Sequence, residues 1–283
     1  MAAAPLLLLR VVLVGLERVA LRRLGDFASP TACAAAFFGV GALVLLPFAR
    51  LGQLPHWAFL RVALPAGLLY AVAYWFYVSA LAQGEVSAAA PLSALGGLFV
   101  VVLGRLVYGE PLTLAKTAGA LLVAGGAAAA QGAPRPGAGA RPALQMGAYA
   151  LLSAVTRMLD KAVAVGGGPA AGTYAFCVFT ITALAQLGLL AVSGGLGELG
   201  GLIAGRPALA LAAGACNGGS FLLLLAALAS VPVSVAEPVT ALSLLVSAAV
   251  AAVWLGERVG PRLLPTAAVV AGTWLLVGGG PLP

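Results

Sequence analysis

One carboxylate, Glu237, lies inside an apolar part of the sequence. It belongs to SVAEPVTAL, residues 234–242, and follows a charge-free run over residues 207–236. A charge near the centre of a bilayer costs about 2.5–3.5 kcal/mol on insertion scales, which makes Glu237 a candidate for contact with a substrate or a proton. The alternative is structural, because a helix beginning at Ser234 would favour an anion near its N-terminus by about 0.3–1 kcal/mol. Pro238 would cost little in such a first turn.

Aromatic side chains supply a second group of candidates. Tyr70, Tyr74 and Tyr77 recur at i, i+4 and i+7, and Trp75 follows Tyr74 directly. This spacing places the three tyrosines on one helix face. Such a face either packs or anchors at the membrane interface, or its rings stack against an amphiphilic substrate or its cation. We therefore keep Tyr74, Trp75 and Tyr77 as candidate substrate contacts.

A polar pair, Asn217 and Ser220, interrupts the apolar run over residues 207–236. The glycines Gly214 and Gly218 beside it have the small-xxx-small spacing that lets two membrane helices approach closely. Asn217 either hydrogen-bonds across that helix contact or holds a ligand. Both polar residues are candidate substrate contacts.

Two acid–base pairs occur near the starts of the two halves of the chain. Glu17 is followed by Arg18, and Asp160 is followed by Lys161. If a helix continues through this region, Arg157, Asp160 and Lys161 share one face at i, i+3 and i+4. Exposed ion pairs contribute little to stability, so these residues either line a hydrophilic gate or anchor the helices at the interface.

The sequence contains none of the motifs that we would expect of an enzyme or an ATP-driven pump. The single histidine, His56, has no H-E-x-x-H partner, and no G-x-x-x-x-G-K phosphate-binding motif occurs. The three cysteines have no metal-ligand spacing. We therefore predict no catalytic residues, no metal site and no cofactor.

Composition places the chain in a membrane. Its 283 residues are 62% hydrophobic and 8% charged, with a mean hydropathy of +1.09, whereas a soluble domain is about 25% charged. The net charge of +7 comes from basic residues scattered singly near predicted helix ends. A nucleic-acid interface would gather them in a patch, so we read them as interfacial anchors and expect no nucleic-acid partner.

The charge-free windows predict an all-α polytopic membrane protein, since a spanning helix needs about 20 apolar residues. The first predicted helix carries several charges, so the alternative is an amphipathic helix that lies on the membrane surface. The ten predicted helices cover residues 5–24, 31–49, 62–82, 86–107, 114–131, 144–164, 170–193, 207–228, 234–255 and 261–279.

Part of the sequence repeats at a constant offset of 147 residues. SAAAPLSAL, residues 87–95, has the same serine, proline and leucine frame as SVAEPVTAL but lacks the glutamate. The offset pairs Pro91 with Pro238 and the Gly-Glu pair ending at Glu110 with the one ending at Glu257. Retention of both glutamates favours a structural role in loop capping or gate closure over contact with a single substrate.

The repeat predicts two five-helix units of opposite orientation. Five predicted helices separate Glu110 from Glu257, and an odd number of crossings puts the two copies on opposite sides of the bilayer. We predict a first unit over residues 1–131, a linker rich in glycine and proline over 132–142, and a second unit over 143–283. Inverted repeats are the architecture of many secondary transporters, which open one central site to each side in turn. The distribution of basic residues does not decide the absolute orientation.

Both copies of the repeat resemble a known family. ALAQGEVSAAAPLSALGG with YGEPLTLAKTAGALLVAGG, and ALASVPVSVAEPVTALSLL with LGERVGPRLLPTAAVVAGTWLL, are similar to EamA-type transporters of the drug/metabolite transporter superfamily. The resemblance implies two inverted five-helix units in the cell membrane, both termini in the cytoplasm, and transport of a small metabolite, often outward. The first predicted helix departs from the family, because it lacks the tryptophan-glycine start and carries more arginine.

Together these patterns predict a secondary transporter that exports or exchanges amino-acid-like or amine-like solutes. Its expected partners are a small-molecule substrate and the lipid bilayer, and a homodimer is an open alternative. Protons are one energy source that we consider, with Glu237 as the carrier. A flippase for lipids or lipid precursors and a non-transporting membrane scaffold are the alternatives, since one fold hosts many functions.

Overall fold

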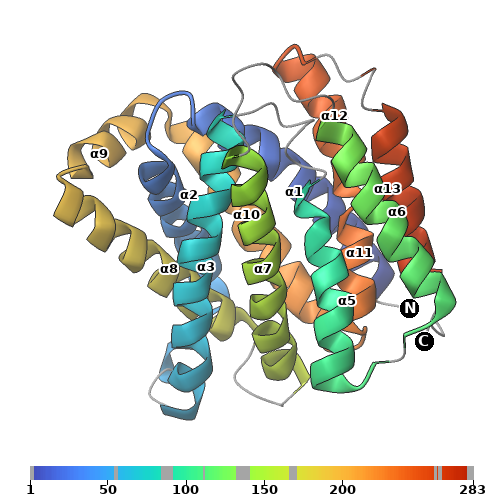
Figure 1. Ribbon diagram of the computed structural model, residues 1–283. Helices are drawn as coiled ribbons and strands as arrows, with labels where there is room; N and C mark the ends of the chain where they lie inside the picture. Colours follow the sequence, from blue (N-terminus) through green and yellow to red (C-terminus); the bar gives the residue numbers. More distant parts are fainter. Residues whose placement is uncertain are drawn as a thin grey trace.

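The structure is a computed structural model of the chain. It describes residues 3–53, 57–83, 92–110, 112–131, 141–165, 171–257, 260 and 263–278. Within these ranges the chain forms twelve α-helices and short 3-10 helices, and no strand (Figure 1). His56, Pro91 and residues 132–140 of the predicted linker lie outside the described part of the chain.

The first half of the chain follows the predicted order of helices. The fourth of these helices was expected to begin at residue 86, a position outside the described residues, and α5 itself begins at Leu95. The helices of this half are α1 (Ala3–Leu24), α2 (Pro30–Leu45), the 3-10 turns η1 (Leu46–Phe48) and η2 (Leu51–Gln53), α3 (Trp57–Gln83), α5 (Leu95–Tyr108) and α6 (Leu114–Gln131).

The second half differs from the prediction in two places. An unpredicted helix, α9, joins α8 to α10, and the ninth predicted helix is broken into α11 and α12 by a turn at residues 241–242. The helices are α7 (Arg141–Val165), α8 (Ala171–Ser193), α9 (Leu196–Gly205), α10 (Pro207–Leu228), α11 (Val233–Thr240), α12 (Ser243–Trp254) and α13 (Leu263–Gly278). The helix α7 also begins two residues before the predicted unit boundary at residue 143, because a proline is tolerated in a first turn.

A side-chain contact accounts for α9. Glu198, in the first turn of α9, accepts hydrogen bonds from the backbone N–H of Ser29 at 2.8 Å and from the Ser29 hydroxyl at 2.6 Å. Gly194 ends α8 in the left-handed conformation, with φ of 72°, which glycine adopts at no steric cost. The connection therefore turns sharply and packs α9 against the start of α2.

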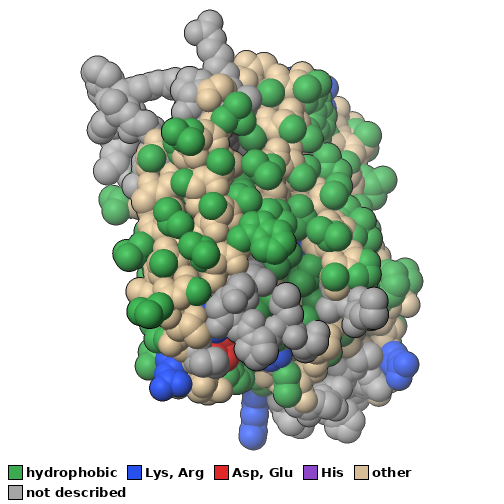
Figure 2. Space-filling view, turned by 90° about the vertical axis from the view of Figure 1, so that its right-hand side faces the viewer, with side chains coloured by type: hydrophobic (Ala, Val, Ile, Leu, Met, Phe, Trp, Pro, Cys, Tyr) green, Lys and Arg blue, Asp and Glu red, His purple; other side chains and the backbone are tan. Residues whose placement is uncertain are grey.

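The outer surface is apolar. Among the described residues, four helical segments are long and apolar enough to cross a membrane: Pro30–Phe48, Arg61–Gln83, Ala171–Ser193 and Pro207–Leu228. Large hydrophobic side chains such as Leu114, Val192 and Val253 are about nine-tenths exposed. Figure 2 shows hydrophobic side chains over the middle of one face, with lysine and arginine side chains near its lower edge. An exterior of this kind suits contact with lipid tails.

Helices of the first half pack mainly against helices of the second half. The helix α1 packs against α10 and α12, and α7 packs against α3 and α5. Two further pairs, α2 with α8 and α6 with α13, join corresponding helices of the two halves (Figure 1). The core is therefore an interface between the halves.

The retained Gly-Glu pairs end α5 and α12 in the same way. Gly109 and Gly256 have φ values of 68° and 69°, the left-handed conformation of a helix C-terminus. The backbone N–H of Glu110 then donates to Gly104 O at 3.2 Å, and that of Glu257 to Ala251 O at 3.3 Å. Helix termination thus explains why both copies keep the glycine.

Candidate substrate-binding cavity

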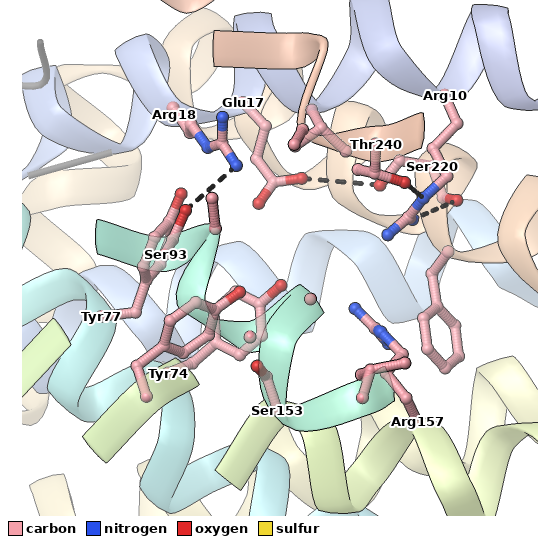
Figure 3. A pocket seen from close by; sticks show the side chains of 18 of the residues that line it. Arg10, Glu17, Arg18, Tyr74, Tyr77, Ser93, Ser153, Arg157, Ser220 and Thr240 are labelled. Atoms are coloured by element: carbon pink, nitrogen blue, oxygen red, sulfur yellow. Dashed lines mark hydrogen bonds between the residues drawn. The ribbon is translucent and has the colours of Figure 1, made fainter. Parts of the chain in front are cut away.

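A polar cavity lies between the two halves, walled by α1, α3, α5, α6, α7, α10, α11 and α13 (Figure 3). Arginine, glutamate, tyrosine and serine side chains line it. Its volume is about 60 Å³, counted as the space open to the centres of water molecules. Because one water needs about 10–15 Å³, the cavity holds a few waters or a small polar group, and a larger solute requires the helices to move apart.

The charged face of α1 points into this cavity. Arg10, Glu17 and Arg18 line it and are all less than a tenth exposed. Arg10 donates from Nε to Thr240 Oγ1 at 3.0 Å and from Nη1 to Ser220 O at 2.9 Å. An amphipathic helix on the membrane surface would turn its charges to water, whereas α1 turns them to the protein interior. The structure therefore argues against the surface-helix alternative.

Arg18 connects the two places where a helix restarts at the cavity. Its Nη1 donates to the hydroxyl of Ser243 at 2.9 Å, and its Nη2 donates to the hydroxyl of Ser93 at 3.3 Å (Figure 3). Ser243 is the first residue of α12, and Ser93 precedes α5 by two positions. Arg18 thus lines the cavity and holds both helix starts.

Glu17 directs its carboxylate into the cavity (Figure 3). The Ser220 hydroxyl lies 3.5 Å from Glu17 Oε2 but only 2.9 Å from the carbonyl oxygen of Asn217. One hydroxyl proton cannot serve both acceptors well, so the shorter bond to Asn217 is the stronger one. Glu17 is therefore weakly held by Ser220, and its carboxylate is available to a solute.

Behind the cavity wall, Asp160 is fully buried in a polar cluster. It accepts hydrogen bonds from Arg157 Nη1 at 2.9 Å, from the Tyr70 hydroxyl at 2.7 Å and from the Tyr174 hydroxyl at 3.0 Å. The Tyr70 hydroxyl also bonds to Arg157. Because a buried charge needs a partner and further hydrogen bonds, Asp160 stabilises Arg157 at the cavity wall without itself lining the cavity.

Aromatic rings form another part of the wall. Tyr74, Tyr77 and Tyr149 line the cavity, with ring centroids 4.5 Å apart for Tyr77 and Tyr149 and 5.6 Å apart for Tyr74 and Tyr149. The predicted contact Trp75 does not line it; the Trp75 ring packs against Phe76 instead. The reason is helical geometry, since Trp75 points about 100° away from Tyr74.

Residues at the 147-residue offset meet across the cavity. The pairs Ser93 with Thr240 and Ala94 with Ala241 all line it. Turns coincide with these pairs, because the turn before α5 is at Ala94 and the turn before α12 includes Ala241. Both halves thus contribute the start of a helix to the same wall.

The remaining predicted residues lie outside the cavity lining or outside the described side chains. Lys161 donates from Nζ to Leu228 O at 2.7 Å and to Val231 O at 2.9 Å, which satisfies carbonyl groups at the end of α10. The backbones of Glu237 and Pro238 belong to α11, and their side chains are not among those described. Of the predicted substrate contacts, Tyr74, Tyr77, Asn217 and Ser220 line the cavity.

The N-terminal part of the chain matches a known transporter family. Residues 1–130 match the EamA-like transporter family. This family belongs to the drug/metabolite transporter superfamily, so the resemblance inferred from the residues is confirmed. The match indicates a membrane transporter of the drug/metabolite type.

A solved structure described as "Crystal structure of protein" is similar over nearly the whole chain. It is 20% identical, covers 97% of this chain and 96% of its own, and superimposes with a TM-score of 0.59. At this identity the likeness shows the fold alone. No curated protein matches the chain.

Several cavity residues were not identified from the sequence. Arg10 lies seven residues before Glu17, a spacing of about two helical turns that places both on one face. Ser93 and Thr240 correspond at the offset of 147. Both signals are present in the sequence. Tyr149 and Ser153 precede Arg157 by eight and four residues, so they share its helix face. The packing of α7 against α3 and α5 brings that face to the cavity.

Proposed function

We propose that this protein is a secondary transporter that works by alternating access and exports or exchanges a small amino-acid-like or amine-like solute. The observation that carries the proposal is a charged cavity at the interface of the two halves, surrounded by an apolar exterior. The two inverted five-helix units would comprise residues 1–131 and 143–283, in the cell membrane with both termini in the cytoplasm.

The packing pattern supports the inverted arrangement. Contacts of α1 with α10 and α12 correspond, after exchange of the halves, to contacts of α7 with α3 and α5. The two capped helices, α5 and α12, end at opposite edges of the bundle in Figure 1. Two units related in this way can exchange conformations, which would open the cavity to one side and then to the other.

The broken helices support movement at the cavity. A turn precedes α5 at Ala94, and another turn separates α11 from α12 at residues 241–242; both places lie in the cavity wall. Transporters commonly form their substrate sites from discontinuous helices at the midplane. A hinge absorbs a change in backbone angles over a few residues, so these turns are where we expect α5 and α12 to tilt.

The buried charges of α1 also support a transport role. Arg10, Glu17 and Arg18 are costly in a membrane segment, and such residues usually face a pathway for a solute or an ion. Glu237 remains our proposed proton carrier, because α11 borders the cavity through Thr240. If Glu237→Gln leaves solute flux and its pH dependence unchanged, Glu237 has no part in coupling.

Flux through the purified protein in proteoliposomes tests the proposal. We expect counterflow of radiolabelled amino acids or amines in vesicles that contain the protein and none in protein-free vesicles. Arg10→Gln should reduce the flux at least tenfold, because it removes the bonds to Thr240 and Ser220. Arg50→Gln, at an exposed position between η1 and η2, serves as the control. Movement of lipid-linked substrates alone would favour a flippase, and no movement of any substrate would favour a scaffold.

A further inference from the structure

The cavity wall contains buried nitrogen atoms that have no hydrogen-bond partner among the described residues. They include Nε of Arg18 and Nδ2 of Asn217, two residues that are only 7% and 3% exposed. Both atoms donate hydrogen bonds and cannot accept them. An unsatisfied buried donor costs about 1–3 kcal/mol, so these atoms indicate a ligand that brings acceptor atoms into the cavity.

The geometry of Arg18 identifies where such a ligand would bind. Its Nη1 bond to Ser243 is 2.9 Å, whereas its Nη2 bond to Ser93 is longer, at 3.3 Å. Nε and Nη2 share one edge of the guanidinium, the edge that binds the two oxygens of a carboxylate or phosphate. A ligand oxygen at Nε can therefore be joined by a second oxygen at Nη2, in place of the weaker serine contact.

The start of α5 adds positive potential beside Arg18. This helix has 14 residues and begins at Leu95, and Gly96 and Gly97 line the cavity. Neither glycine has a side chain, so the backbone itself forms the wall there. The N-terminus of a helix carries a partial positive charge that favours an anion.

We propose that the cavity binds its solute through an acidic group, a carboxylate or a phosphate, held at the Nε edge of Arg18 with Asn217 as a further donor. This inference rests on the proposed transport function and specifies its substrate class. Glu17, in the same cavity, provides a place for an amino group on the same solute. A simple amine has no anionic oxygen and leaves both donors unsatisfied.

Thermal unfolding of the full-length protein in detergent tests this inference with matched probes. One series is leucine, 4-methylpentanoate, 3-methylbutyl phosphate and 3-methylbutylamine, which share an apolar part and differ in the head group. A second series is tyrosine, 3-(4-hydroxyphenyl)propionate and tyramine. We expect the acids of at least one series to raise the unfolding temperature and the amines to leave it unchanged. Whether the carboxylate or the phosphate gives the larger increase shows which acidic group the cavity prefers.

Two results would overturn the inference. One is stabilisation by an amine but not by its matching acid, and the other is no stabilisation by any acid. The proposed function is judged separately by flux in proteoliposomes. Flux of amines without a preference for acids would contradict binding through an acidic group but not the transport function. The absence of any flux would contradict the transport function itself.

Variants assign the effect to Arg18. We expect Arg18→Gln to weaken binding of the stabilising acid at least tenfold, and Arg23→Gln, which changes a partly exposed arginine of the same helix outside the cavity lining, to leave it unchanged. Ser243→Ala removes a contact of Arg18 but keeps the guanidinium, so it should retain the preference for acids. Loss of that preference in Ser243→Ala would mean that Arg18 only links helices. If Arg18→Gln does not fold, Asn217→Ala tests the same preference, with a smaller expected loss.

Discussion

The acid–base pair of α1 and the pair of α7 have similar sequences but opposite surroundings. Glu17 faces the cavity, where the Ser220 hydroxyl lies at a long 3.5 Å, whereas Asp160 is enclosed by donors from α3, α7 and α8. Arg18 donates hydrogen bonds to serine hydroxyls near the starts of α5 and α12, and Lys161 donates a hydrogen bond to a carbonyl at the end of α10. The pair in α1 thus lines the cavity, whereas the similar pair in α7 stabilises the packing of the helices.

This difference separates groups that are available to a solute from groups that are already satisfied. The carboxylate of Asp160 forms an ion pair with Arg157, whereas the carboxylate of Glu17 is directed into the cavity. A scaffold residue should affect stability when it is changed, and a cavity residue should affect binding. The following predictions test that separation, beginning with the largest expected effect.

Asp160→Asn should lower the free energy of unfolding by about 3–5 kcal/mol, because it leaves the buried charge of Arg157 uncompensated. Denaturant unfolding of the purified protein in detergent measures the loss. Asp26→Asn is the control, since Asp26 pairs with Arg22 and Arg23 near the surface, where ion pairs contribute little. Equal losses in the two variants would contradict a scaffold role for Asp160.

Gly272→Val should lower the free energy of unfolding by about 1–3 kcal/mol through overpacking. A Cβ atom at Gly272 would lie 2.6 Å from the backbone oxygen of Gly119, at the crossing of α6 and α13. Gly125, at the matching position of the first half, has nothing within 4 Å of that point. Gly125→Val should therefore change stability little in the same measurement, and equal effects would show that the crossing is not close.

Glu17→Gln should reduce solute flux about tenfold, equivalent to about 1.4 kcal/mol, and leave stability nearly unchanged. The reason is that Glu17 directs its carboxylate to the cavity and accepts a long hydrogen bond, of 3.5 Å, from Ser220. Counterflow in proteoliposomes gives the flux, and detergent unfolding gives the stability. Asp26→Asn, which changes an exposed carboxylate outside the cavity, is the control. A large loss of stability with normal flux would assign Glu17 to the scaffold.

Gly109→Ala and Gly256→Ala should each lower the free energy of unfolding by about 1 kcal/mol, because both positions need a left-handed backbone. The two losses should be equal if the halves end their helices in the same way. Gly188→Ala in α8 is the control, since a Cβ there meets nothing within 4 Å and alanine is favoured in a helix. Unequal losses at Gly109 and Gly256 would indicate different caps.

Most of the helices were predictable, because hydropathy is a local property that survives in any tertiary arrangement. The break between α11 and α12 was not predictable, since apolar residues flank it on both sides and no Gly or Pro occupies residues 241–242. The helix α9 was missed for a related reason. Its ten residues are too few to span a bilayer, and its contact is with Ser29, more than 160 residues earlier.

The candidate site was predictable only in part. Helical spacing correctly grouped Tyr74 with Tyr77, but Trp75 was included because it is adjacent in sequence, and adjacency places residues on different helix faces. The charges of α1 were identified as unusual, although their direction was not. A polar stripe has the same pattern whether it faces water at a membrane surface or a cavity inside the protein.

The sequence by itself determined that this chain forms apolar helices in two related halves. A helix satisfies its backbone hydrogen bonds within one segment, and an apolar segment prefers lipid whatever its neighbours are. Only the tertiary structure decided that Glu17 is available to a solute and that Asp160 is not. The role of a buried charge depends on partners from distant segments, and here Tyr70 and Tyr174 reach Asp160 from α3 and α8.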